Sequence, residues 1–464
     1  MATISESSQT AAPAKTILGH PPGLAFLVFA ESWERFSFYG MQALLVLYMD
    51  QQLFLPGHIN HIAGFPPFRA AIESLYGHLS PAALASAVFG IYAGGVYLTP
   101  LAGGVIADRL LGRTRTVTIG ALLMAAGHFL MAFEASFLLA LTCLLVGVGC
   151  FKGNIATQVG ELYGPGDPRR ADAFQIYQFG IAIAVIFSPL ICGTLGQKVA
   201  WHWGFGAAGV GMVLGLGVYL SGRHFLPPER RAGSAAPRKH LAPGEGKTIL
   251  VLFALLPALV LSMLGNQEIY NAYIIWGNTN YNLAIFGQAM PVTWLISIDA
   301  GLGAIVLLAV IAGWRWWERT HAPVREITKL TLGAFSMAVA SAILALASLY
   351  EQASGKKIGL AWALAFHIVN GIGFSNLIPV GLALFSRAAP RAVAGVMIGV
   401  FYLHLFVGNM VVGWLGGLLE TMPPVRFWLL HAALIGAGGC LMLLLRAAFG
   451  HLLAPTVDPE AEAA

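Results

Sequence analysis

The composition of the chain excludes several classes of protein. Of its 464 residues, 57% are hydrophobic and only 10% are charged, whereas a soluble domain carries about 25% charged residues. No soluble core could hide this much apolar surface. The formal net charge of +5 is no sign of nucleic-acid binding, because the basic residues are confined to short loops between apolar segments. A membrane protein that crosses the bilayer many times is therefore predicted.

Twelve apolar stretches, each long enough to cross a bilayer, follow one another along the chain. Most loops between them are short, but residues 50–80 and 222–247 form longer ones, and the second is rich in proline, glycine and charge. This second loop divides the stretches into six and six, the layout of a transporter built from two repeated bundles. The predicted spans lie near residues 22–49, 81–107, 115–133, 136–160, 172–197, 203–221, 248–277, 290–313, 327–350, 358–386, 392–419 and 426–449.

Loop charges predict how this all-α chain is oriented. The loops after the even-numbered spans contain 17 lysines and arginines, against 5 in the loops after the odd-numbered spans. Basic loops stay in the cytoplasm, so we expect both termini and the linker there, in a bacterial inner membrane. The predicted parts are an N-terminal tail over 1–21, a six-helix bundle over 22–221, a cytoplasmic linker over 222–247, a second six-helix bundle over 248–450 and a C-terminal tail over 451–464.

The first span contains three charged residues, Glu31, Glu34 and Arg35, on one helical face. Charges inside a membrane are energetically unfavourable and usually mark a functional site. A further cation, Lys152, lies in the fourth span. At 1.5 Å per residue, Glu34 and Lys152 lie roughly 18 Å and roughly 12 Å from the cytoplasmic side, which makes a salt bridge geometrically possible. Acids that face cations at this depth can bind and release protons, and we therefore expect proton-coupled transport.

Other polar residues in the spans are interpreted as packing residues. The four cysteines have no acid or histidine companions at ligand spacing, so neither a metal site nor a disulfide is expected. Nor does any nucleotide-binding motif suggest ATP-driven transport, and no cofactor is expected. Four histidines are scattered one per span without ligand spacing, and pairs of small residues in the second span indicate close helix packing. These residues are Cys143, Cys150, Cys192 and Cys440; His128, His367, His404 and His431; and Gly90, Gly94, Gly95 and Thr99.

Motifs in the first half carry a resemblance to a known family. The run ESWERFSFYG, residues 31–40, resembles the E-x-x-E-R-F-x-x-Y-G signature of proton-dependent oligopeptide transporters, the POT family within the major facilitator superfamily. VYLTPLAGGVIADRLLGR, residues 96–113, looks like that family's second span and following loop, and residues 144–163 resemble its fourth span. The resemblance covers most of the chain but is weaker in the second half. It implies the twelve-helix facilitator fold in two six-helix bundles.

The resemblance also implies roles for the residues that match. Glu31, Glu34 and Arg35 correspond to the family's proton-coupling cluster, and Lys152 corresponds to its salt-bridge partner. Tyr39 and Tyr97 match pocket tyrosines that contact substrate, although plain core packing is an alternative for both. Further candidate substrate contacts lie at or next to pocket positions of the family, and at several of them this chain has a different residue from the one usual in the family. These residues are Gln42, Tyr177, Gln178, Asn266, Gln267, Phe374 and Phe401.

One departure bears directly on specificity. Phe374 stands where the family has a tenth-span glutamate that pairs with the amino terminus of a peptide. Two acids of the second half, Glu268 in span 7 and Asp299 in span 8, are candidates to replace it. One of them would then face the cavity and bind a substrate ammonium group. The alternative is that neighbouring helices satisfy both acids.

These observations predict a proton-coupled symporter that takes up di- or tripeptides or related compounds. Within transport, the alternatives are a non-peptide solute (a modified peptide, an amino acid derivative or a small anion) and export. The alternative of another class is a polytopic membrane enzyme or scaffold, but the spans contain no nucleophile–base pair or metal cluster that would indicate one. The expected partners are a small peptide, protons and membrane lipids, with no nucleic acid, and the expected state is a monomer.

Overall fold

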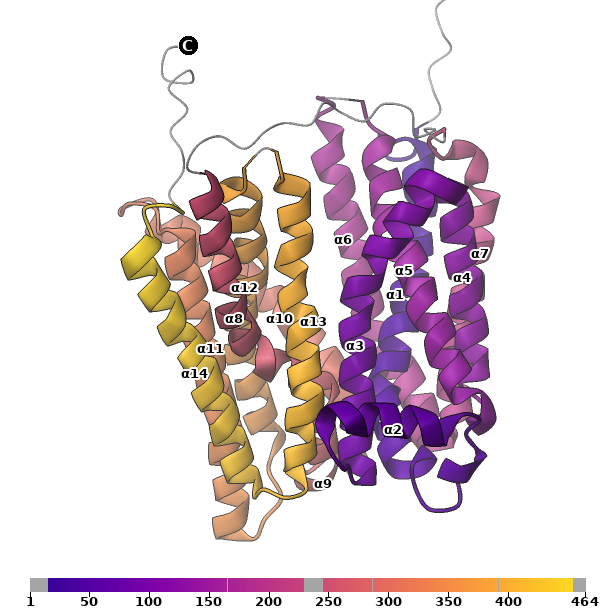
Figure 1. The fold of residues 1–464 in the computed structure, drawn as a ribbon, viewed down its shortest axis with the longest axis vertical. Coiled ribbons are helices and arrows are strands. Elements are labelled where there is room, and N and C mark those ends of the chain that lie inside the picture. The colour runs from indigo at the N-terminus through magenta and orange to yellow at the C-terminus, as the bar shows by residue number, and fades with distance from the viewer. Residues whose placement is uncertain (1–15, 165, 229–244, 286, 391, 454–464) are drawn as a thin grey trace, which may run out of the picture.

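The structure, a computed structural model, describes residues 16–164, 166–228, 245–285, 287–390 and 392–453, and it is almost entirely helical (Figure 1). Within the described residues of the first half, the α-helices are α1 (Pro22–Tyr48), α2 (Phe65–Tyr76), α3 (Pro81–Ile106), α4 (Arg113–Leu130), α5 (Phe137–Glu161), α6 (Arg169–Ser188) and α7 (Trp201–Ser221). Those of the second half are α8 (Glu245–Gln267), α9 (Ala272–Asn280), α10 (Trp294–Trp317), α11 (Glu326–Ser354), α12 (Leu360–Ala388), α13 (Ala394–Gly416) and α14 (Pro424–Phe449).

Short irregular elements extend or join these helices. A small antiparallel hairpin, β1 (Ala284–Ile285) and β2 (Gln288–Ala289), precedes α10, with Ala284 paired to Ala289. Short π-helical turns, which are wider than α-helical ones, continue several helices at their carboxyl ends. The π-helical turns are Met49–Leu53 after α1, Ala107–Leu111 after α3, and Pro189–Gly193 and Leu195–Val199 after α6.

Each predicted span coincides with a helix, except that the seventh is divided. Residues 248–277 contain α8, a 3₁₀ turn at Glu268–Tyr270 and α9. The break falls at Asn271, whose backbone leaves the helical region with φ −125° and ψ −111°. Its side-chain Nδ2 donates to Ser86 Oγ at 2.7 Å and to Val412 O at 3.2 Å. These contacts with other helices favour the break, and they are invisible in a local pattern.

The loop predicted over residues 50–80 contains α2, which the hydropathy pattern did not predict. Its first turn contains two prolines, Pro66 and Pro67, and the first turn of a helix tolerates proline because its N–H groups have no intrahelical partner. Phe65 and Ile72 are its buried residues, and the rest of the helix is mostly exposed. A helix with so narrow an apolar stripe lies on the surface rather than across a membrane.

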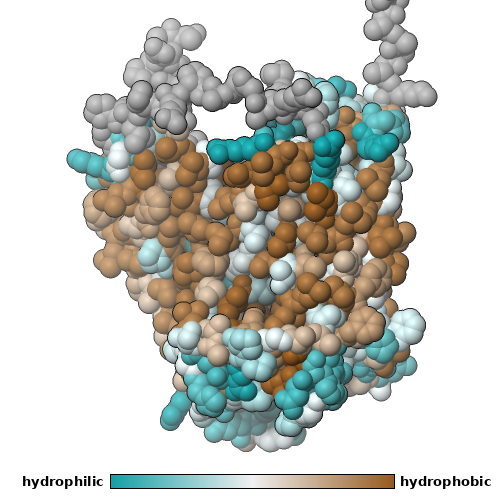
Figure 2. Space-filling model, turned by 45° about the vertical axis from the view of Figure 1, so that its right-hand side comes forward, coloured by the Kyte–Doolittle hydropathy of each residue, from teal (hydrophilic) through white to brown (hydrophobic). Residues whose placement is uncertain are grey.

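On the face that Figure 2 shows, a wide apolar band lies between two more polar ends. Ten helices among the described residues are long and apolar enough to cross a membrane. α1, with its three charged residues, and α4, which begins with Arg113 and Arg115, are not among the ten. Both nevertheless pack inside the bundle, α1 against α6 and α7 and α4 against α5 and α7. The chain is therefore an integral membrane protein with the two-bundle architecture of the facilitator fold.

The two halves meet mainly through α3 with α13 and α6 with α10. At the first contact two glycines allow the backbones to touch: a Cβ atom on Gly90 would lie 2.6 Å from the Cα atom of Gly413, closer than real Cβ atoms come. Gly94 also faces α13, whereas Gly95 faces Leu145 of α5. The spacing of small residues in α3 thus marks two packing faces, as the sequence predicted.

Hydrogen bonds between the halves gather at one end of the molecule. Within the described part of the chain, they join Tyr76 to Met410, Ser80 to Glu420, Asn271 to Ser86, Thr293 to Gln197, and Trp294 to Thr194. All of these lie toward the end that carries α2, opposite the end where α1 begins and α14 ends (Figure 1). The two bundles are therefore tied together at the α2 end.

Candidate functional site

The charged residues of α1 form one buried cluster. Glu31, Glu34 and Arg35 are 2%, 0% and 3% exposed. Arg35 Nε lies 3.0 Å from Glu31 Oε1 and also forms an ion pair with Glu34. One arginine thus serves two carboxylates, and Glu34 Oε1 has no hydrogen-bond partner among the described residues. An unpaired buried charge is costly, so the arginine between the two carboxylates allows these three charges to lie inside the bundle.

Lys152 of α5 lies beside this cluster without pairing to it. None of the described carboxylates lies within 4.0 Å of its ammonium group, which sits 5.0 Å from the centre of the Tyr97 ring. It is still within electrostatic range of Glu31, Glu34 and Arg35. Two acids and two bases give the group zero net charge when all are ionised. The salt bridge between Lys152 and the first span, predicted as geometrically possible, is therefore not formed among the described residues of this structure.

Tyrosines surround the charged cluster. Tyr177 of α6 lies beside Glu31 and is buried. Half-buried Tyr39 stands one helical turn beyond Arg35, and its ring centre lies 6.2 Å from that of Tyr270. Sequence analysis did not identify Tyr270, which lies in the 3₁₀ turn after α8. With Tyr97 beside Lys152, these phenols give the surroundings of the charged cluster a polar, aromatic character.

The second half contains an acid–histidine chain at Asp299. His367 Nδ1 lies 2.8 Å from Asp299 Oδ1, and His367 Nε2 lies 3.0 Å from the hydroxyl of Tyr273. A carboxylate oxygen only accepts, so Nδ1 donates to Asp299. If Nδ1 carries the ring's single proton, Nε2 accepts from the hydroxyl of Tyr273. Asp299 remains 21% exposed while His367 is fully buried. This carboxylate is thus held in place by one oxygen and partly open to solvent.

Glu268 is held differently. Its Oε2 accepts from the backbone N–H of Ala272 at 3.0 Å, and its Oε1 lies 3.1 Å from His431 Nε2. His431 Nδ1 lies 2.9 Å from the carbonyl oxygen of Phe427, which can only accept, so Nδ1 carries a proton. His431 Nε2 and Glu268 Oε1 can then form a hydrogen bond only if one more proton lies between them, either on the ring or on the carboxyl group. Both side chains are 0% exposed, so Glu268 faces the interior of the bundle and not a cavity.

Two of the histidines interpreted as packing residues are therefore acid partners. The pairing of Asp299 with His367 could have been found from their depths in the membrane. Asp299 is five residues and His367 seven residues from the starts of their helices, which places them roughly 8 Å and 10 Å along the helix axes. Both helices begin on the same side of the predicted membrane. His128 and His404 are buried among the described residues with no acid partner, as a packing role predicts. The four cysteines are free thiols.

The other residues predicted to contact the substrate do not form one group in the structure. Gln42 is buried, and its Oε1 has no hydrogen-bond partner among the described residues. Gln178 is exposed, and Asn266 and Gln267 are half-buried at the end of α8. Phe374 is 40% exposed, whereas Phe401 is 0% exposed and packs against Phe385 with ring centres 5.2 Å apart. Phe401 belongs to the core of the second bundle in this conformation.

Comparison with known proteins gives a consistent result. The sequence model described as "POT family" matches residues 114–241. The chain is 28% identical over 510 residues to "Peptide transporter YePEPT" of Yersinia enterocolitica, covering 93% of this chain and 95% of that protein. It is 29% identical over 501 residues to the "Di-/tripeptide transporter" of Lactococcus lactis, with 93% and 96% covered.

Solved structures agree in fold. A crystal structure of a peptide transporter POT in complex with alafosfalin matches with a TM-score of 0.81 at 23% identity, covering 95% of this chain and 97% of that one. A POT family transporter in complex with 5-aminolevulinic acid matches with a TM-score of 0.79 at 19% identity, covering 93% and 97%.

Proposed function

We propose that the chain is a transporter of the POT family that couples inward proton movement to the uptake of small peptides. The observation that carries the proposal is the buried cluster of Glu31, Glu34 and Arg35 beside Lys152. Fully ionised, this group is neutral. Binding of one proton to a carboxylate leaves one positive charge uncompensated, and the carboxylate end of a peptide supplies the missing negative charge. Proton and substrate binding then favour each other.

Asp299 is the proposed partner of the peptide's amino group. Its carboxylate is partly exposed, whereas that of Glu268 is enclosed by His431 and Ala272. Tyr270 lies within electrostatic range of both Tyr39 and Asp299, so it stands between the two halves of the site. A short zwitterion would place its carboxylate toward Arg35 and Lys152 and its ammonium group toward Asp299.

The hydrogen bonds between the halves suggest which state the structure represents. They are concentrated at the α2 end, and the loop-charge bias places that end outside the cell. We infer an inward-facing conformation, closed to the outside. Since the site is built within a single chain, we propose that the monomer is the working unit.

A binding panel tests the substrate class. Free di- and tripeptides are the first candidate substrates. Because Phe374 stands where the family has a carboxylate, a second candidate substrate is an amino acid derivative or modified peptide whose charges lie closer together. Thermal shifts with dipeptides, tripeptides, single amino acids and N-blocked peptides separate the two. Stabilisation by free di- or tripeptides supports the first candidate. Stabilisation only by shorter zwitterions supports the second.

Cysteine labelling tests the proposed orientation in an inner membrane. In a background lacking Cys143, Cys150, Cys192 and Cys440, Thr320→Cys after α10 and Lys356→Cys after α11 provide a matched pair of exposed loop positions. Cysteine at 356 is expected to react with an impermeant maleimide in intact cells, and cysteine at 320 only after lysis. The reverse pattern would invert the orientation.

A further inference from the structure

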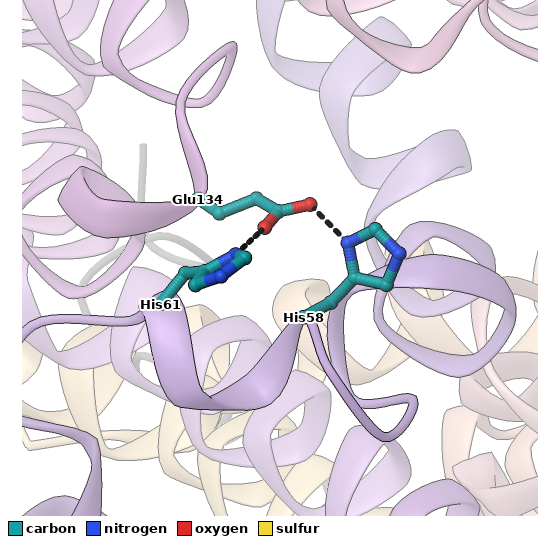
Figure 3. Close-up of side chains that lie close together, drawn as sticks. All are labelled: His58, His61 and Glu134. Atoms are coloured by element: carbon teal, nitrogen blue, oxygen red, sulfur yellow. Dashed lines mark hydrogen bonds and ion pairs between the residues drawn. The ribbon is translucent and has the colours of Figure 1, made fainter.

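Two histidines and one glutamate meet on the loops at the α2 end (Figure 3). His58 precedes the short 3₁₀ turn Ile59–His61 before α2, His61 is the last residue of that turn, and Glu134 precedes α5. His58 Nδ1 lies 2.7 Å from Glu134 Oε1, and His61 Nδ1 lies 3.0 Å from Glu134 Oε2. One carboxylate therefore holds two imidazoles that come from a distant part of the sequence.

Core packing does not explain this arrangement. The side chains of His58 and His61 are 45% and 66% exposed, and Glu134 is 20% exposed. Exposed pairs of this kind contribute little to stability. Because the cluster lies in exposed loops, it takes no part in the buried charge network of α1. Three convergent donor groups at a solvent-accessible position are better explained by a ligand.

The donor atoms of His58, His61 and Glu134 indicate which kind of metal ion would bind. One donor atom from each residue lies within 4.8 Å of the other two, and donor atoms around a tetrahedral Zn²⁺ are roughly 3.3 Å apart for bonds of about 2.0–2.1 Å. Two imidazole nitrogens and one carboxylate oxygen suit Zn²⁺ and its transition-metal neighbours, whereas Ca²⁺ and Mg²⁺ prefer oxygen. Small side-chain movements would let an ion replace the two hydrogen bonds.

The surroundings leave room for the ion and orient its ligand. Gln52 Nε2 donates to Glu134 Oε1 at 3.2 Å, the kind of outer contact that fixes a metal-binding carboxylate. A cavity of about 420 Å³, lined by His61, Glu134, Tyr48 and Trp201 among others, opens beside the cluster. Water from this side would complete the coordination.

We propose that His58, His61 and Glu134 form a binding site for a Zn²⁺-class transition metal on the outer loops of the first bundle. All three ligands belong to this one bundle. The ion would therefore connect the loop before α2 to the start of α5 without tying the two bundles together. It would stabilise the first bundle.

Titration of Zn²⁺ into the purified, tag-free protein in detergent, by calorimetry and by thermal unfolding, tests the proposal. The wild type is expected to bind one Zn²⁺ per chain, with a rise in Tm that Mg²⁺ does not produce. His61→Gln and Glu134→Gln should each weaken binding at least about tenfold, because even outer partners of a metal ligand are worth about 10–100-fold.

His78→Gln is the matched control. His78 is an exposed histidine that pairs with Glu73 nearby but lies outside the cluster, so its loss should leave the affinity for Zn²⁺ unchanged. The proposal is overturned if Zn²⁺ shows no saturable binding, or if the His61 and Glu134 variants bind it as tightly as the His78 variant.

Discussion

Replacing Lys152 with alanine is expected to abolish peptide accumulation driven by a pH gradient while leaving peptide exchange intact. The cluster would lose one of the two positive charges that offset its carboxylates, so a proton bound there would no longer be released. Proton and substrate would then cease to be linked. Coupling free energies of about 1–3 kcal/mol correspond to roughly 5–150-fold, so gradient-driven uptake should fall at least about fivefold. Counterflow, which needs no net proton movement, reports on substrate binding and bundle movement alone.

Lys198→Ala provides the control for this variant. Lys198 is an exposed lysine in the turn after α6, far from any acid of the cluster along the chain. The Lys198→Ala variant should transport like the wild type in both gradient-driven uptake and counterflow. Normal pH-driven accumulation by Lys152→Ala would remove Lys152 from the coupling mechanism, whatever its position beside Tyr97.

Replacing Asp299 with asparagine is expected to reduce recognition of a free amino terminus. Asparagine keeps the size of the side chain and an acceptor for His367, but it removes the charge. A hydrogen bond to a charged group is worth about 1.5–3 kcal/mol, which corresponds to roughly 10–150-fold in the KM for free dipeptides. N-acetylated peptides lack the ammonium group, so their weaker transport should not change. Competition uptake with matched free and acetylated peptides measures the difference.

Glu268→Gln is the matched change at the other acid of the second half. Its amide can still satisfy His431 and the N–H of Ala272, and its site is fully enclosed. We therefore expect no change in preference for a free amino terminus. Phe374→Glu should increase dipeptide affinity if the tenth-span position still faces the substrate. An unchanged preference in Asp299→Asn, with tight binding of free dipeptides by the wild type, would contradict the proposed role of Asp299.

The helices and the charged face of α1 could be predicted because each depends on local spacing. A run of about twenty apolar residues must become a span, and residues at i, i+3 and i+4 must share a helical face. Glu31, Glu34 and Arg35 therefore meet whatever the rest of the chain does. The glycine spacing of α3 predicted close packing for the same reason, although not that Gly90 would face Gly413 of α13.

Contacts between side chains on different helices could not be predicted from local sequence patterns. His367 and His431 looked like isolated packing residues because nothing near them in sequence reveals the acids that they contact across the bundle. The break at Asn271 depends on Ser86, a residue 185 positions away. Whether Lys152 pairs with α1 depends on the conformation of the bundles, which a sequence does not specify.

The most direct test of proton-coupled peptide uptake is accumulation of a radiolabelled dipeptide by proteoliposomes under an inward pH gradient. The account predicts that the dipeptide will concentrate above its external level, that a protonophore will abolish the accumulation, and that unlabelled di- and tripeptides will compete. Uptake that only equilibrates the dipeptide, with or without the gradient, by protein that still catalyses counterflow would contradict proton coupling.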